Sequence, residues 1–305
     1  RASSYGRDMD TRDEIRDFLS SRRAKITPEQ AGLPAYGGAH RRVPGLRREE
    51  VAMLAGVSND YYVRLERGNL AGVSEEVLDA LAGALQLDEA ERAHLYDLAR
   101  AAANRPARAR RRAPVHSVPV SVQVMLDAMT GAPAVVRNER LDILATNPLG
   151  RALYSELYRD PTRPANHARF AFLDPTAHDF WVDWERAADD TVGLLRTLAG
   201  RDPHDRELHD LVGELSTRSE DFRARWARHN VHLHRGGTKR INHPVVGRLE
   251  LMYDTLPIAQ APGLTMIVYT AAPGTTTADA VALLASWAAT QAHPDPAALA
   301  PPTAG

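Results

Sequence analysis

The chain has 305 residues, a formal net charge of −1 and no cysteine. This length predicts two domains, each able to bury its own core. The lack of cysteine excludes disulfides, thiol catalysis and thiolate metal ligands, and the lack of a long apolar run or an apolar leader predicts a cytoplasmic protein without a membrane partner.

The first segment, residues 1–10, is expected to be disordered. Ile15 and Phe18 then lie one turn apart, which predicts a first helix over residues 12–24. A connection rich in glycine and proline follows over residues 26–46 and ends in a basic stretch. Because a loop of this length inside a domain usually has a function, its arginines are candidates for phosphate contacts.

Residues 48–68 are the most informative segment, because their pattern is that of two short helices joined by a glycine turn. Val51 belongs to the apolar face of the first of these helices, Gly56 permits a left-handed turn, and Ser58 is suited to cap the second helix. This is the pattern of a helix-turn-helix, whose second helix reads DNA. The side chains expected to point outward from that helix are polar or aromatic: Asn59, Asp60, Tyr61, Tyr62, Arg64 and Arg67.

Two further helices complete an all-α five-helix domain over residues 11–103. Ser74 is suited to cap the fourth helix, and Asp88 forms an Asp-x-x-Glu capping box with Glu91 at the start of the fifth. Residues 104–119 are rich in arginine and proline and lack apolar periodicity, so we expect a linker there.

Residues 120–292 alternate between helical and strand patterns, which predicts an α+β domain with an antiparallel sheet. A hairpin is expected over residues 133–146, and a flexible tail over residues 293–305. Further helices are expected over 120–130, 149–157, 176–199, 206–217, 221–229 and 278–289, and further strands over 239–242, 247–256 and 264–269.

The chain also resembles a known family. Its first half is similar to the Xre-type helix-turn-helix domain through the motifs RRVPGLRREEVA (41–52), LAGVS (54–58), YY (61–62) and RLE (64–66). As a whole it resembles the MmyB-like transcriptional regulators, whose second domain has a PAS-like fold. The matching motifs there are PA (133–134), LATNP (144–148), FLDP (172–175), DW (183–184), FR (222–223), WA (226–227) and HPVVG (243–247). Two positions depart from the family pattern, Thr146 in place of the usual tryptophan and Asn230 in place of the usual aspartate.

The resemblance implies that the helix beginning near Ser58 lies in the major groove of double-stranded DNA. Asn59 is suited to bind an adenine edge, and for Asp60 we favour a capping role over a contact with cytosine. Phosphate contacts are assigned to Arg47, Arg48, Arg64 and Arg67, and Arg41 and Arg42 would track the DNA backbone or enter a minor groove. The alternative for Arg64 and Arg67 is an ion pair with a carboxylate of the first two helices.

Glu66 is expected to have an architectural role, paired with an arginine of the first helix such as Arg22, since a carboxylate near phosphates is repelled. A single reading helix binds DNA weakly. We therefore expect a homodimer that reads inverted half-sites about one helical turn apart.

For the second domain, the resemblance implies an apolar cavity and a small hydrophobic, fatty-acid-like ligand. The aromatic residues there recur at helical spacing, so each is also a candidate core residue. An acyl chain would need one cationic or hydrogen-bonding group for its head. The candidate ligand contacts are Asn147, Phe180, Trp184, Phe222, Trp226, Arg228, His229 and His243.

A zinc site is the alternative for the histidines, because His232 and His234 would share one face of an extended segment close to His229 and His243. No acidic residue accompanies them at a recognisable ligand spacing, so we predict neither a metal nor a cofactor. The sequence also contains no phosphate loop, no nucleophile elbow and no His-Glu-x-x-His motif, and we therefore predict that the protein is not an enzyme.

The sequence thus predicts a sequence-specific DNA-binding transcriptional regulator, expected to be a repressor, whose second domain senses a small ligand. Two alternatives stay open. In the first the second domain only dimerises, and in the second the chain is a lipid-binding protein or enzyme with a DNA tether.

Overall fold

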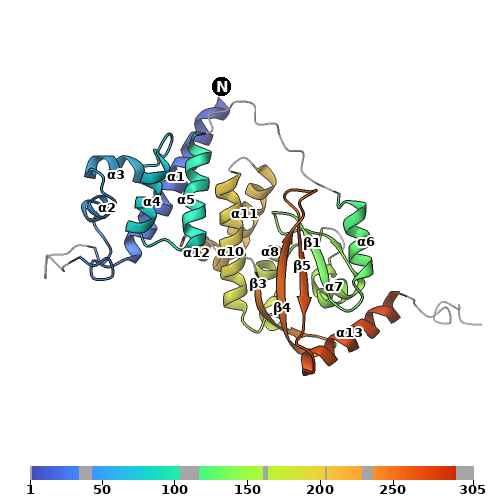
Figure 1. Cartoon of the computed structure of the whole chain (residues 1–305). Coiled ribbons are helices and arrows are strands. Elements are labelled where there is room, and N and C mark those ends of the chain that lie inside the picture. The colour runs from blue at the N-terminus through green and yellow to red at the C-terminus, as the bar shows by residue number, and fades with distance from the viewer. Residues whose placement is uncertain are drawn as a thin grey trace, which may run out of the picture. The chain divides into compact units, whose positions relative to one another are not determined.

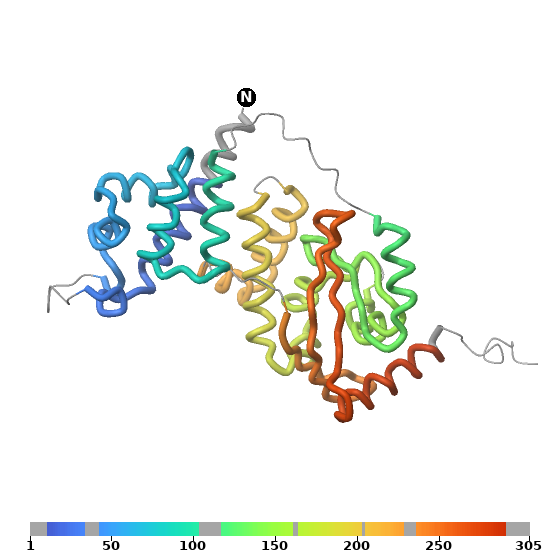
Figure 2. The backbone as a smooth tube through the Cα atoms, viewed as in Figure 1, coloured from blue at the N-terminus to red at the C-terminus, as the bar shows by residue number. Residues whose placement is uncertain are grey.

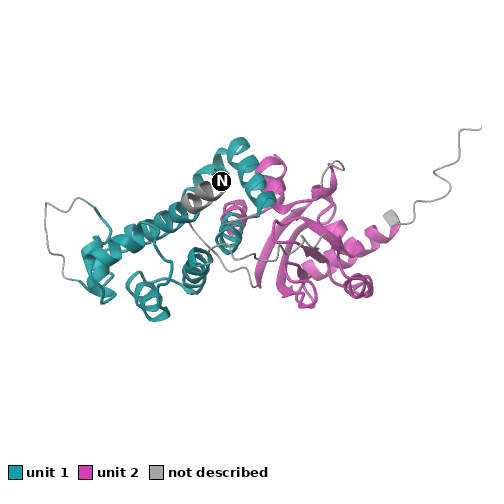
Figure 3. Ribbon diagram, turned by 90° about the horizontal axis from the view of Figure 1, so that it is seen from above, with its two compact units in different colours: residues 1–111, 192–233 teal, residues 112–191, 234–305 magenta. Residues whose placement is uncertain are grey.

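The computed structural model of the protein describes residues 2–33, 43–103, 117–160, 164–202, 205–228 and 236–292. The chain divides into two compact units (Figure 3). Unit 1 contains residues 1–111 and 192–233, and unit 2 contains residues 112–191 and 234–305. Each unit is therefore assembled from two separate stretches of the chain.

Unit 1 begins with five helices, which confirms the predicted helical domain. The helices are α1 (Ala2–Lys25), α2 (Arg48–Leu54), α3 (Asn59–Glu66), α4 (Glu75–Ala84) and α5 (Glu89–Ala103) (Figure 1). Their common core includes Ile15, Phe18, Leu46, Val51, Leu65, Leu81, Leu95 and Leu98. The helix expected over residues 12–24 starts earlier in the structure, since α1 includes residues 2–11. That segment has no proline, and a nucleated helix gains one hydrogen bond for each added residue.

The helix starts follow local side-chain chemistry, as predicted. The Ser58 hydroxyl accepts a hydrogen bond from the N–H of Tyr61 at 3.1 Å, and Ser74 caps α4 in the same way. At the start of α5 the bonds are reciprocal, since the N–H of Glu91 donates to Asp88 Oδ1 at 2.8 Å and the N–H of Asp88 donates to Glu91 Oε2 at 3.1 Å. These bonds satisfy N–H groups that have no partner inside the helix.

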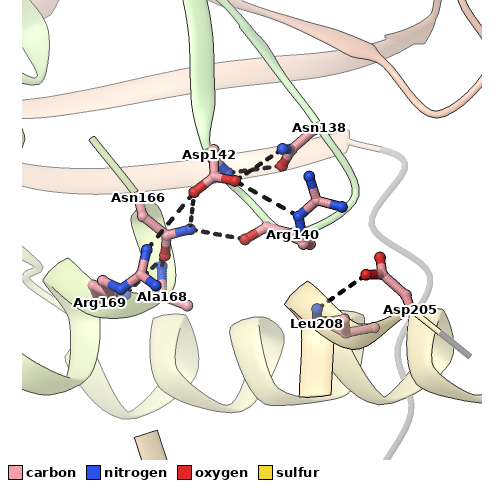
Figure 4. A network of polar contacts seen from close by, with 8 residues as sticks. All are labelled: Asn138, Arg140, Asp142, Asn166, Ala168, Arg169, Asp205 and Leu208. Carbon is pink, nitrogen blue, oxygen red and sulfur yellow. Dashed lines mark hydrogen bonds and ion pairs between the residues drawn. The ribbon is translucent and has the colours of Figure 1, made fainter. Parts of the chain in front are cut away.

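The second stretch of unit 1 contains the end of α10 (Trp184–Arg201), then α11 (Arg206–Arg218) and α12 (Glu220–Trp226). Asp205 caps α11 by accepting from the N–H of Leu208 at 3.1 Å (Figure 4). Gly200 of α10 lies directly against the ring of His94 in α5, where an added Cβ would come within 2.3 Å of a ring carbon. Close packing of α10 on α5 thus requires glycine at this position.

Unit 2 contains a five-stranded antiparallel sheet with the strand order β2-β1-β5-β4-β3. The strands are β1 (Ala134–Arg137), β2 (Ile143–Thr146), β3 (Gly236–His243), β4 (Gly247–Pro257) and β5 (Thr265–Thr270), and Figure 2 shows the long β4–β5 hairpin. In β4, buried Leu249, Leu251 and Tyr253 alternate with exposed Glu250 and Met252. The period of two that predicted this strand therefore reflects one buried face.

Helices cover both faces of β1. On one face Val135 joins a core cluster with Ile267, Leu284 of α13 (Thr276–Ala292) and the helices after β2. On the other face, Val136 packs in a second cluster with Leu126 of α6 (Val120–Ala128). The remaining helices of unit 2 are α7 (Pro148–Leu153), α8 (His167–Leu173), α9 (Ala177–Phe180) and the first part of α10, with a 3₁₀ turn at Ser155–Tyr158.

The helix expected over residues 176–199 is interrupted in the structure. α9 ends at Phe180, Trp181 forms an isolated antiparallel bridge with Ile241 of β3, and α10 begins at Trp184. The N–H of Val182 donates to the carbonyl oxygen of Arg240 at 3.1 Å. A tertiary bond to the sheet edge therefore competes with helix continuation, and helical spacing alone could not predict this.

A polar network around Asp142 holds the β1–β2 turn against the start of α8 (Figure 4). The Asp142 carboxylate accepts from Asn138 Nδ2 and from Asn166 Nδ2, both at 2.8 Å. Asn166 Oδ1 in turn accepts from the N–H groups of Ala168 and Arg169, each at 2.9 Å. The buried Asn166 side chain thus connects the β1–β2 turn with α8. α8 has only 7 residues, which are too few to give a periodic signal in the sequence.

None of the helices in the described ranges is both long enough and apolar enough to cross a membrane.

Candidate functional site

The α2–α3 pair has the geometry expected of a helix-turn-helix. Gly56 has φ +64° in the turn between the helices, so the left-handed conformation predicted there is present. Asn59 and Asp60 are exposed in the first turn of α3, and Arg64 and Arg67 are exposed further along and just beyond its end. The surface of α3 therefore carries amide, carboxylate and guanidinium groups that can reach a groove.

Tyr62 is a correction to the predicted DNA contacts. It is fully buried in the helical core beside Leu65, and burial raises the pKa of its phenol. Tyr61 is only half-buried and lies under the Arg64 guanidinium, which is 4.8 Å from the centre of its ring. Of the two adjacent tyrosines, only Tyr62 thus points into the core, where it packs α3 against the other helices.

Asp60 does not cap α3, contrary to the role that we favoured. Ser58 occupies the capping position and makes the capping hydrogen bond. Asp60 lies one residue inside the helix, in the first turn, where its charge is favourable to the helix dipole. Its exposed carboxylate can accept a hydrogen bond from a cytosine amine.

Glu66 is architectural as predicted, but its partner on α1 is Arg23. Arg23 Nε donates to Glu66 Oε1 at 2.7 Å, and Arg48 Nε of α2 donates to Glu66 Oε2. Arg22 instead pairs with Glu91 of α5. Because Glu66 is only 2% exposed, this carboxylate fixes α1, α2 and α3 to one another from the interior.

The arginines that were predicted to contact phosphates differ in their ion-pair partners within the protein. Arg48 is half-exposed and bound to Glu66, and the hydrogen bond with that carboxylate raises the pKa of its guanidinium. Arg47 Nη1 lies 3.3 Å from Glu49. Neither Arg64 nor Arg67 forms an ion pair with a residue that the structure describes, so the predicted alternative of a carboxylate partner is not seen. Arg41 and Arg42 lie outside the described residues.

In unit 2, Asn147 is a structural residue and not a ligand contact. Its side-chain oxygen accepts from the N–H groups of Gly150 at 2.7 Å and Ala134 at 3.0 Å. Its nitrogen donates to the carbonyl oxygens of Met129 at 2.6 Å and Ala132 at 2.7 Å. These four bonds use the full capacity of the amide, so no donor remains for a ligand.

His243 is also a structural residue. Its Nε2 lies 3.0 Å from the carbonyl oxygen of Ala152, and its Nδ1 accepts from the N–H of Val245 at 3.2 Å. Both bonds fit the neutral ring protonated on Nε2, and burial lowers the pKa of His243.

Phe180 lies in the core, while Trp184 donates from Nε1 to the carbonyl oxygen of Ala171 at 2.9 Å. The Trp184 ring stacks on His178 with ring centres 3.9 Å apart. Trp184 and His178 line a shallow hollow of about 460 Å³ together with Trp181 and Arg240.

The other predicted ligand contacts belong to unit 1, so the predicted set is divided between the units. The rings of Phe222 and Trp226 in α12 stack with centres 5.5 Å apart, and Arg228 is exposed beyond that helix. The Arg196 guanidinium of α10 lies 4.1 Å from the centre of the Trp226 ring and donates to the Trp226 carbonyl oxygen. Its Nη1 also contacts Glu14 of α1 at 2.6 Å. Trp226 therefore packs on the arginine of the ion pair that joins α10 to α1.

Sequence reasoning missed a group of polar side chains on the face of the sheet that carries Val135 and Ile267. Arg137 is 8% exposed and Lys239 is half-buried. The hydroxyl groups of Tyr154 and Tyr269 are 2.6 Å apart. The available signal was the position of Arg137 at the end of an apolar strand and the position of Lys239 within a strand pattern, but charged strand residues usually face solvent.

Within the described ranges, no three His, Asp or Glu side chains are grouped closely enough to hold a metal ion. His229, His232 and His234 of the zinc alternative lie outside these ranges.

Comparison with known protein families supports both halves of the architecture. Residues 22–95 match a helix-turn-helix domain, and residues 118–284 match the MmyB-like transcription regulator ligand binding domain. A comparison with curated proteins gave no match. A DNA-reading domain and a ligand-binding domain in one chain are the two parts of a transcriptional regulator. The chain therefore belongs to the MmyB-like family of transcription regulators.

Proposed function

We propose that this protein represses transcription as a homodimer, reading inverted DNA half-sites with α3 and responding to a small hydrophobic, fatty-acid-like ligand. The observation that carries the proposal is the surface of α3. Asn59, Arg64 and Arg67 are exposed without a described carboxylate partner, whereas Tyr62 and Glu66 of the same helix are buried and hold it in place. An exposed reading surface on a rigid helix is what DNA recognition requires.

The strand order β2-β1-β5-β4-β3 with helices packed on the sheet supports a PAS-like fold for the second domain. In such a fold a ligand would lie between the sheet and its helices. Native mass spectrometry of the purified protein, with and without a promoter duplex, would report subunit number and retained ligand together. A ligand-free monomer that ignores DNA at low salt would contradict the proposal.

Asn59→Ala is expected to relax the preference for one base pair in each half-site by roughly 1–3 kcal/mol of discrimination, because a bidentate amide contact is lost. Arg67→Ala should weaken binding to all sequences alike and reduce the salt slope by about one, because only a phosphate contact is lost. Arg67 is a cleaner choice than Arg48, whose guanidinium also holds Glu66. Binding to a panel of single-base operator variants at several salt concentrations measures both effects, and equal changes of base preference in the two variants would contradict this division of roles.

For signal transfer we propose α10, a single helix whose first residues belong to unit 2 and whose last residues belong to unit 1. Its Trp184 end packs in the unit 2 core, and its Arg196 binds Glu14 on α1. A ligand can act on DNA binding only if it has different affinities for two states of the protein. A shift of α10 that strengthens or breaks the Arg196–Glu14 pair would define two such states.

Arg196→Met is expected to uncouple the ligand from DNA. With dodecanoate as the probe, the ratio of the operator Kd with and without the acid should differ from one in the wild type and approach one in the variant. Arg218→Met, which removes an exposed arginine paired within α11, is the matched control. If Arg196→Met kept the wild-type ratio, α10 would not carry the signal.

A further inference from the structure

The sheet of unit 2 has an outer face, opposite the face that carries the main apolar core, and α6 covers only part of it. The register places Val136 of β1 beside Met266 of β5, and Met266 beside Leu256 of β4, so these three side chains share the outer face. Val136 and Met266 are buried in the cluster beneath α6, whereas Leu256 is exposed. The cover therefore ends between β5 and β4.

The uncovered part of the outer face is an open strip on β4 and β3. It is formed by the exposed side chains of Arg248, Glu250, Met252, Asp254 and Leu256 of β4 and of Arg240 of β3. Strands lie about 4.8 Å apart in a sheet and a helix is about 10 Å in diameter, so one helix covers about two strands. The core cluster beneath α6 takes its strand residues from β2, β1 and β5, and α6 is the one described helix that contributes to it. The open strip thus has the width of one further helix.

α6 itself has apolar residues on two opposite sides. Val122 and Leu126 pack on the sheet. Val120 and Val124 each precede one of them by two positions, which is about 200° around a helix, so they point away from the sheet. Val124 is 62% exposed, Val120 is more exposed still, and Asp127 is the only charged residue of the helix. Because a helix that is apolar all round is normally buried, we expect the outward side of α6 to be covered as well.

The charges of the open strip do not oppose such a cover. Its two carboxylates, Glu250 and Asp254, are matched in number by two guanidinium groups, Arg240 and Arg248. Arg240 also lies beside Glu250 in the register of β3 and β4. A nearly uncharged helix therefore meets no single-sign field on the strip, and the apolar side chains of β4 remain for it to contact.

We propose that a second copy of this chain covers the open strip with its own α6. The α6 of each subunit then lies between two sheets. Val122 and Leu126 face the sheet of their own subunit, and Val120 and Val124 face the open strip of the partner. A twofold axis repeats this contact, so the dimer covers both exposed surfaces of each subunit, whereas a helix from a different protein would cover only the strip. This inference rests on the proposed function, because it locates the interface of the homodimer.

Analytical ultracentrifugation of the full chain tests the proposal by measuring the dimer Kd. Val124→Glu places a carboxylate against the partner's strip, and Met252→Arg places a guanidinium on the strip itself. Each should raise the dimer Kd at least tenfold, because burying an unpaired charge is strongly unfavourable. Leu283→Glu is the matched control, since Leu283 is 59% exposed on α13, which packs against the opposite face of the sheet. It should dimerise as the wild type does, and all three variants should keep the wild-type melting temperature of the monomer.

An equimolar mixture of the Val124→Glu and Met252→Arg proteins gives the sharper measurement. In a mixed dimer, one of the two contacts joins the new carboxylate to the new guanidinium, and the other joins the original Val124 to the original Met252. The mixture should therefore dimerise at least tenfold more tightly than either variant alone. In a dimer held together by α6 alone, Met252→Arg would instead behave as the wild type.

The proposal is overturned if either variant dimerises as tightly as the wild type, or if the mixture is no tighter than its components. Binding to operators with one and with two half-sites is measured in parallel. Both variants should bind a single half-site as the wild type does and lose affinity only for the inverted pair. A wild type that is dimeric, and stays dimeric in both variants, overturns this interface and leaves the homodimer intact. A wild type that stays monomeric even on the inverted pair contradicts the homodimer itself.

Discussion

Asn147→Ala is expected to destabilise unit 2 by about 4 kcal/mol or more. The substitution removes one amide that bonds the N–H groups of Ala134 and Gly150 and the carbonyl oxygens of Met129 and Ala132. All four backbone groups would then lack this partner inside the domain, and each unmet buried group costs roughly 1–3 kcal/mol. Urea unfolding followed by fluorescence and circular dichroism measures the change.

Two further substitutions make this result specific. Asn147→Ser keeps a hydroxyl that can cap α7, so its loss of stability should be smaller than that of alanine. Gln123→Ala removes an exposed amide in α6 that bonds only Asp127 one turn away, and its effect should stay within about 0.5 kcal/mol. An Asn147→Ala protein as stable as Gln123→Ala, but with weakened ligand binding, would restore the role that the sequence suggested.

Glu66→Ala is expected to destabilise the helix-turn-helix by about 3–5 kcal/mol, which is the usual effect of removing one partner from a buried ion pair. Arg23 is largely buried and would lose its counter-ion, while Arg48 would be freed from α3. The orientation of α3 depends on this carboxylate, so operator affinity should fall even at temperatures where the variant is folded. Thermal unfolding and operator binding measured on the same sample separate the two effects.

The exposed pair between Arg47 and Glu49 provides the comparison. Glu49→Ala should change the free energy of unfolding by less than about 1 kcal/mol, because a surface ion pair is weak. Adding Arg23→Met to Glu66→Met should recover part of the stability lost by Glu66→Met alone. Additive losses in that double variant would show that the two side chains are not energetically coupled.

The first half of the fold could be predicted because its signals are local. Ser58, Ser74 and the Asp88–Glu91 box act within one helical turn, and Gly56 acts at its own residue. The inward turn of Tyr62 is different, because it depends on where α1 and α2 lie. Two adjacent tyrosines have the same chemistry in the sequence, and only the tertiary core distinguishes them.

The interior of unit 2 could not be predicted for a related reason. Alternation identifies the two faces of a strand but not which face a distant strand will help to bury. Arg137 and Lys239 come onto one face only through the order β1-β5-β4-β3, which joins segments about a hundred residues apart. The short helix α8 was missed because its start depends on Asn166, which also bonds Asp142 across a turn.

The division of unit 1 between two stretches has a consequence for synthesis on the ribosome. Residues 2–103 emerge before the rest of this sequence, and their local contacts allow the five helices to form early. The surface that carries Glu14 and His94 nevertheless waits for α10, α11 and α12, which are made only after β1 and β2 of the other unit. A nascent chain stopped within residues 104–119 would expose that surface, and a gene fragment ending there would encode a reading head without its partner helices.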